Sequence, residues 1–151
     1  MSTGSETLQQ FFPATSRPLI CNAPDGGCDE CQNGCGGSQS RGIRQLFGIV
    51  DSNAPLPIGV GCLTMKSDTW KDNFVQLVNE HRPVAVWLFA YTRRSQHAEL
   101  IHALQKTSRD WGLKVIVQVG TVESAKEAID DGVDILTVQG SDAINSSRGL
   151  V

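Results

Sequence analysis

The sequence has few of the features that mark membrane, secreted or nucleic-acid-binding proteins. No apolar run approaches the roughly 18 residues that a membrane-spanning helix needs. The first ten residues are polar and lack the basic start and apolar centre of a secretory signal peptide. The formal net charge of −3 leaves no basic surplus for nucleic acid or an anionic membrane. We therefore expect an intracellular, cytoplasmic protein with no nucleic-acid and no membrane partner.

The sequence does contain enough apolar residues for a folded core. Of its 151 residues, 40% are hydrophobic and 19% are charged. These values suit one domain of ordinary size and exclude a wholly disordered chain. We divide the sequence into an N-terminal arm over residues 1–17 and a single domain over residues 18–151.

Five cysteines are present, and three of them crowd together as Cys28, Cys31 and Cys35. An odd number of cysteines in a reducing compartment is poor support for a disulfide framework. The three thiolates could instead bind zinc, which takes four tetrahedral ligands, with Cys21 or Cys62 as the fourth. No second Cys-x₂-Cys pair follows in the sequence, so a zinc-binding protein is the weaker interpretation.

From residue 56 onward, short apolar runs alternate with stretches of helical character. We expect helices over residues 68–80, 95–111 and 122–131, and strands over residues 18–23, 57–63, 83–90, 114–120 and 134–140. The last four strand runs are rich in β-branched residues and almost continuously apolar, as in strands buried on both faces. This order predicts an α/β fold of parallel strands joined by crossover helices.

The pattern leaves two architectures open, a doubly wound open sheet and a (β/α)₈ barrel. Both bind ligands at the carboxyl ends of their strands. Polar residues or glycines are found at these ends, at Asn22, Gln118, Gly120, Gln139 and Gly140. The length favours the open sheet, because a complete barrel typically takes about 250 residues.

Five motifs, taken in order, resemble the nitronate monooxygenase family, also called 2-nitropropane dioxygenase-like, in its fungal form. They are PLICNAP (18–24), LPIGVG (56–61), PVAVWLFA (83–90), VQVGTVESA (117–125) and VQGSDA (138–143). The resemblance implies a partial (β/α)₈ TIM barrel whose strands correspond to strands one and three to six of the family. Residues 18–151 would then form an incomplete flavin-binding barrel domain.

The resemblance also implies a chemistry. The family consists of FMN-dependent oxidoreductases that oxidise alkyl nitronates or nitroalkanes with O₂. The protein must hold the flavin, place a base within hydrogen-bond reach and exclude water. The positions that match the family's flavin contacts are Asn22, Ala23, Pro24, Gln118, Gln139, Gly140 and Ser141.

The segment over residues 25–44 departs from the family pattern. It is an irregular stretch rich in cysteine and glycine, where the family has its first helix and second strand. Codons for these residues, read one nucleotide forward, permit the family's helix followed by its Gly-Gly-Phe-Gly strand. We hypothesise that residues 25–44 are the family helix translated out of frame.

A second departure concerns the catalytic base. The family continues its sixth-strand motif with Gly-Gly-His, whereas here Ala143 is followed by residues 144–151 with no histidine. We expect His81 to precede a strand on the wrong side of the barrel, and His97 and His102 to lie on the surface of a helix. With no catalytic residue, and with strands seven and eight missing, we expect an inactive form or a non-catalytic fragment.

Overall fold

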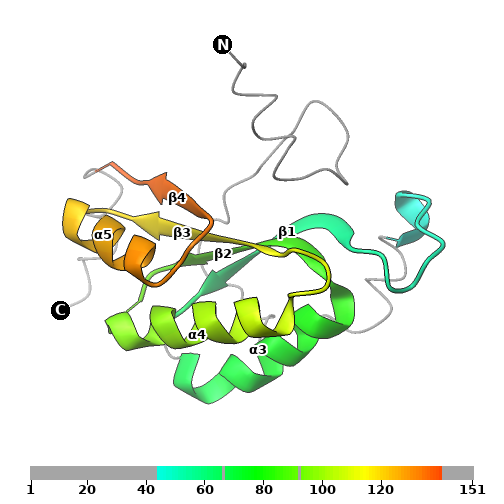
Figure 1. Cartoon of the computed structure of the whole chain (residues 1–151), viewed down its shortest axis with the longest axis horizontal. Helices are drawn as coiled ribbons and strands as arrows, with labels where there is room; N and C mark the ends of the chain where they lie inside the picture. Colours follow the sequence, from blue (N-terminus) through cyan, green and yellow to red (C-terminus); the bar gives the residue numbers. More distant parts are fainter. Residues whose placement is uncertain (1–43, 66, 92, 141–151) are drawn as a thin grey trace, which may run out of the picture.

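The computed structural model of the protein describes residues 44–65, 67–91 and 93–140. Within them, strands and helices alternate in the order β1 (Leu56–Leu63), α3 (Ser67–His81), β2 (Pro83–Phe89), α4 (Arg94–Thr107), β3 (Lys114–Val119), α5 (Val122–Asp130) and β4 (Ile135–Val138) (Figure 1). Each apolar run from residue 56 onward thus forms one strand, which confirms the predicted alternation. The arm over residues 1–17, the strand expected over 18–23 and the irregular segment over 25–43 lie outside the described residues.

The strands of the described region form one parallel sheet in the order β1-β2-β3-β4. Each crossover therefore steps to the next strand in the same direction. Right-handed crossovers that always step the same way place their helices on one face of the sheet. Accordingly α3 packs on α4 and α4 on α5, and Figure 1 shows α3 and α4 side by side under the sheet. The described strands show no reversal of order, which is consistent with part of the wall of a TIM barrel.

The hydrophobic core lies between this face of the sheet and the helices. Its most buried members come from β2, β3 and α4, with exposed fractions of 0–1%: Val86, Leu88, Leu100, Ile101, Leu104, Val115 and Val117. The strand members alternate along each strand because successive side chains point to opposite faces. Burial of one such side chain stabilises the fold by roughly 1.5–3 kcal/mol.

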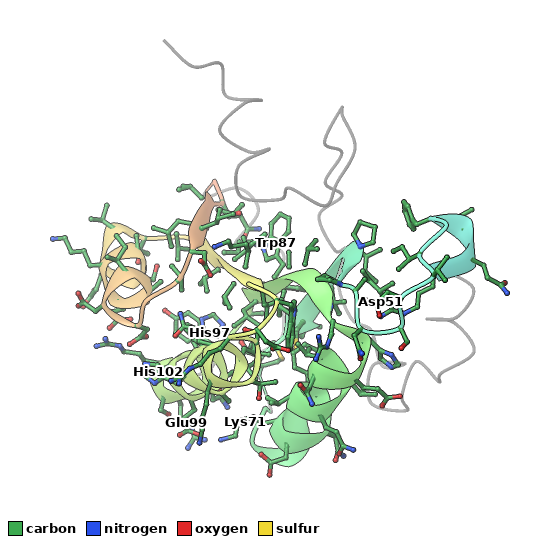
Figure 2. All side chains as sticks on the ribbon, turned by 45° about the vertical axis from the view of Figure 1, so that its right-hand side comes forward. Asp51, Lys71, Trp87, His97, Glu99 and His102 are labelled. Carbon is green, nitrogen blue, oxygen red and sulfur yellow. The ribbon has the colours of Figure 1, made fainter. Side chains whose placement is uncertain are left out.

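The opposite face, which we call the inner face, carries the alternate strand side chains. Its half-buried members are Leu63, Trp87, Phe89, Ile116, Gln118, Ile135 and Thr137. Figure 2 shows Trp87 on the side of the sheet away from the α4 residues His97 and His102. The expectation of strands buried on both faces therefore holds on the helix side only, since no described helix covers the inner face.

Helix α4 ends at Thr107 rather than at the predicted Trp111. Gly112 adopts a left-handed φ of +70°, and its N–H donates to the carbonyl of Ser108 at 3.1 Å. The indole N–H of Trp111 is thereby turned to the carbonyl oxygen of Pro83, 3.1 Å away at the start of β2. A tertiary hydrogen bond and a glycine turn thus end the helix early. None of the described helices is both long and apolar enough to cross a membrane.

Candidate functional site

The candidate site lies on the inner face, where β3 and β4 end. Gln118 is the next to last residue of β3 and pairs with Thr137 of β4. Gln139 follows β4, and its backbone N–H donates to the carbonyl of Val119 at 2.9 Å, which extends the pairing beyond the strand. Because Gln139 is two residues beyond Thr137, its side chain points to the same face as that of Gln118.

The two glutamine side chains meet. The Nε2 of Gln118 donates to Oε1 of Gln139 at 2.5 Å, and both side chains are half-buried. Positions predicted separately as flavin contacts are therefore brought together across neighbouring strands, although they are 21 residues apart in sequence. The ends of two neighbouring strands thus place two amide side chains in direct contact.

The amide pair leaves several of its hydrogen-bond donors and acceptors unused. Each amide offers two donor hydrogens and an acceptor oxygen, and their mutual contact uses one donor of Gln118 and one lone pair of Gln139. The remaining donors and acceptors can bond to the edge of a planar ligand on which donors and acceptors alternate, as they do on an isoalloxazine ring. Ile116 lies two residues before Gln118 on the inner face and pairs with Trp87 of β2, and these two side chains can supply apolar surface for the body of such a ring. The described residues therefore fit a flavin ring.

The other predicted flavin contacts are placed only in part. Gly140 is exposed just after Gln139, and a Cβ built on it would meet nothing within 4 Å. The described surroundings thus do not themselves require glycine at this position. The remaining predicted contacts lie outside the described residues, namely Asn22, Ala23, Pro24 and Ser141.

The prediction that His97 lies on the surface is wrong. Its side chain is 4% exposed, because it lies on the stripe of α4 that also holds Leu100, Ile101 and Leu104. That i, i+3, i+4, i+7 spacing is the signal in the sequence that could have placed it. His102 is exposed, as predicted.

His97 is part of a cluster that the sequence did not predict. Its ring lies against that of Tyr91, which follows β2, and its Nε2 has no hydrogen-bond partner among the described residues. Burial lowers the pKa of His97 to about 4, although the charge of Asp131 opposes this shift. The pKa of the Tyr91 hydroxyl is raised, chiefly by burial and then by the charge of Glu127. The imidazole is thus neutral at physiological pH.

None of the three histidines of the sequence faces the amide pair. His81 ends α3 just before β2, at the amino edge of the sheet, as predicted. His97 and His102 both belong to α4, on the helix side of the sheet. The described structure therefore places no imidazole base at the candidate site.

A zinc site involving Cys62 is not supported. Cys62 is 6% exposed and packs in the hydrophobic core between the sheet and the helices. Among the described residues, no group of three His, Cys, Asp or Glu side chains could hold a metal ion. Cys21, Cys28, Cys31 and Cys35 lie outside the described residues.

The described parallel sheet, with paired amides at its carboxyl edge, defines an α/β protein, and parallel sheets of this kind commonly bind ligands at their strand ends. Comparison with known proteins gives the family. Nitronate monooxygenase of Neurospora crassa is 30% identical over 177 positions, which cover 90% of this chain and 46% of the relative. Nitronate monooxygenase npaC of Metarhizium robertsii is 39% identical over 170 positions, which cover 95% of this chain and 46% of the relative. The chain belongs to the nitronate monooxygenase family.

Two features qualify the match. The chain spans about half the length of these curated relatives. Both matches also run over more positions than the 151 residues of the chain, so each relative contains residues inside the matched region that have no counterpart here. No family model matches the sequence.

Proposed function

We propose that this chain carries the flavin-binding scaffold of an FMN-dependent oxidoreductase that oxidises alkyl nitronates or nitroalkanes with O₂. The observation that supports this most directly is the Gln118–Gln139 amide pair at the carboxyl edge of the inner face. Relatives that bear the name nitronate monooxygenase support the reaction class. Both lines point to the same small-molecule chemistry.

The described residues would hold the cofactor by its ring. Bound FMN supplies the electron transfer from nitronate to oxygen. Gln118 and Gln139 would bond the polar edge of the ring, while Ile116 and Trp87 exclude water from its apolar part. The predicted contacts Asn22, Ala23, Pro24, Gly140 and Ser141 would complete the flavin site.

We further propose that this chain binds flavin but does not turn over neutral nitroalkanes, whose oxidation begins with removal of a proton. A base must lie within hydrogen-bond reach of the proton that it removes. The three histidines lie at the amino edge or on the helix side of the sheet, away from the amide pair. Nitroalkane oxidation that starts with proton removal would therefore lack its base.

The test is an FMN titration of the purified 151-residue chain, followed by flavin fluorescence, together with oxygen consumption in the presence of a neutral nitroalkane. We expect saturable binding of one FMN per chain and oxygen consumption no faster than that of free FMN. Absence of FMN binding would refute the flavin site. Nitroalkane-dependent oxygen consumption above the free-FMN rate would refute the missing-base proposal and would leave the flavin site standing.

A further inference from the structure

One row of side chains crosses the inner face near the carboxyl ends of the strands. From β1 to β4 its half-buried members are Leu63, Phe89, Gln118 and Thr137. Leu63 pairs with Phe89, and Gln118 pairs with Thr137. Phe89 and Gln118 directly follow the paired residues Leu88 and Val117, so they are neighbours as well. We call these four side chains the strand-end row.

The residue before each member of the strand-end row fixes the direction of that member. Cys62, Leu88 and Val117 belong to the core on the helix side, and Leu136 packs against this core. Successive side chains of a strand point to opposite faces, so the next residue on each strand points to the inner face. The row is therefore apolar on β1 and β2 and polar on β3 and β4.

The backbone of Phe89 is held at the end of β2 by hydrogen bonds from the end of β1. Its carbonyl oxygen accepts from the backbone N–H and from the Oγ1 of Thr64, both at 3.0 Å, and Thr64 has no exposed surface. The next residue, Ala90, has a left-handed φ of +55°, so the extended backbone ends at Phe89. Residues other than glycine adopt this conformation at a cost, and such strain is frequent at binding sites.

The strand-end row has the length of a flavin ring system. Neighbouring strands lie about 4.8 Å apart, so the row extends about 10 Å from β3 to β1. This is comparable to three fused six-membered rings with their substituents. The isoalloxazine ring has its polar pyrimidine end and its apolar dimethylbenzene end at the two ends of that length. Two residues earlier on β2 and β3, Trp87 and Ile116 form an apolar level beneath the row.

We propose that the flavin ring lies across the strand ends, with its pyrimidine end at Gln118 and Gln139 and its dimethylbenzene end against Phe89 and Leu63. This inference rests on the proposed function, and it adds Phe89 and Leu63 as residues that position the cofactor. The reverse orientation would place methyl groups against the two amides and leave their desolvated donors and acceptors unpaired. The division of the row into an apolar and a polar half thus selects one orientation.

The experiment compares FMN with an analogue that lacks both methyl groups of the benzene end, which we call the demethylated analogue. Each ligand is titrated into the purified chain and its variants by flavin fluorescence, and the measured quantity is the ratio of the two dissociation constants. Phe89→Ala removes the aromatic ring, and Phe89→Leu keeps an apolar side chain there. Phe47→Ala is the matched control, at a phenylalanine that is 51% exposed and precedes β1.

We expect the unchanged chain to bind FMN about tenfold more tightly than the demethylated analogue, because two methyl groups leave water. In Phe89→Ala this ratio should fall to about twofold, whereas Phe89→Leu should keep most of it. Leu63→Ala should lower the ratio as well, and it replaces Phe89→Ala if that variant does not fold. Gln118→Leu should weaken both ligands by the same factor, and the Phe47→Ala control should bind both as the unchanged chain does. Thermal unfolding by circular dichroism verifies that each variant is folded.

The orientation and the flavin site fail by different results. A ratio that stays near that of the unchanged chain in folded Phe89→Ala and Leu63→Ala would overturn the orientation and leave the flavin site standing. Equal affinity of the unchanged chain for FMN and for the demethylated analogue would overturn the orientation in the same way. Binding of neither ligand would refute the flavin site and the orientation together.

Discussion

The ring of Tyr91 lies against the ring of His97, with centroids 4.4 Å apart and planes tilted by 51°. Tyr91 belongs to the loop after β2, and His97 to the first turns of α4. Arg94, also on α4, forms an ion pair with Asp131 just after α5, with Nη2 and Oδ1 3.3 Å apart. The start of α4 is thus joined both to the loop before it and to the neighbouring helix.

Acid should destabilise the fold through His97. Its pKa is about 4 in the folded chain and 6.5 when unperturbed, so between these values the unfolded chain binds more protons. The free energy of unfolding therefore decreases as the pH falls from about 6.5 to about 4, by roughly 3 kcal/mol in total, at 1.36 kcal/mol per pKa unit. Urea unfolding at a series of pH values measures this slope.

The His97→Phe variant keeps a ring beside Tyr91 and removes the titrating group. The free energy of unfolding of this variant should depend much less on pH between pH 6.5 and pH 4. The exposed control His102→Phe should keep the pH dependence of the unchanged chain. Equal slopes in the two variants would show that burial of His97 is not the cause.

The amide pair should contribute to FMN affinity. Gln118→Leu or Gln139→Leu removes one partner of a half-buried hydrogen bond and leaves the other amide with an unmet donor or acceptor. We expect the dissociation constant for FMN to rise about tenfold for each variant, which corresponds to roughly 1.4 kcal/mol. Gln76→Leu, at an exposed position of α3, is the control. Unchanged affinity in both pair variants would place the flavin elsewhere.

The core between α4 and the sheet should dominate stability. Leu100 has no exposed surface and packs on buried strand residues, so Leu100→Ala leaves a cavity. The expected loss is about 2–5 kcal/mol in the free energy of unfolding. Leu46→Ala, at a side chain that is 80% exposed, should change it by less than about 0.5 kcal/mol. Equal losses at the two positions, measured by urea unfolding, would contradict the described core.

Asp134 should hold the start of β4 against β3. Its carboxylate accepts from the backbone N–H of Val115 at 2.9 Å and from Nζ of Lys114 at 3.1 Å. Asp134→Ala should cost about 1.5–3 kcal/mol, because both donors lose a charged acceptor. Asp134→Asn retains an acceptor for Val115 and should cost less. Thermal unfolding of the two variants gives the comparison, and an equal effect of both would assign the stabilisation to charge alone.

The hypothesis on residues 25–44 is tested at the nucleotide level. Sequencing of the transcript over these codons should show the family helix and its Gly-Gly-Phe-Gly strand in the forward-shifted frame. A transcript whose shifted frame contains a stop codon, or lacks this pattern, would refute the hypothesis. The cysteines in this segment would then need their own explanation.

Much of the fold could be predicted because its signals are local. The run over residues 83–90 is apolar and β-branched, and β2 covers Pro83–Phe89. Helix ends were less predictable, as at Trp111, whose indole N–H bonds the carbonyl of Pro83, 28 residues away. Short-range patterns contain no information on such a partner.

The sequence by itself determined the alternation of strands and helices, the positions of polar residues at the strand ends and, through its motifs, the family. These features follow from the spacing of apolar side chains and from the order of residues, which are properties of each segment on its own. Only the tertiary structure decided that the strands neighbour one another in sequence order, that Gln118 contacts Gln139 and that His97 is buried. Each of these depends on which distant segments pack together, and that is set by the balance of burial and hydrogen bonding over the whole sheet.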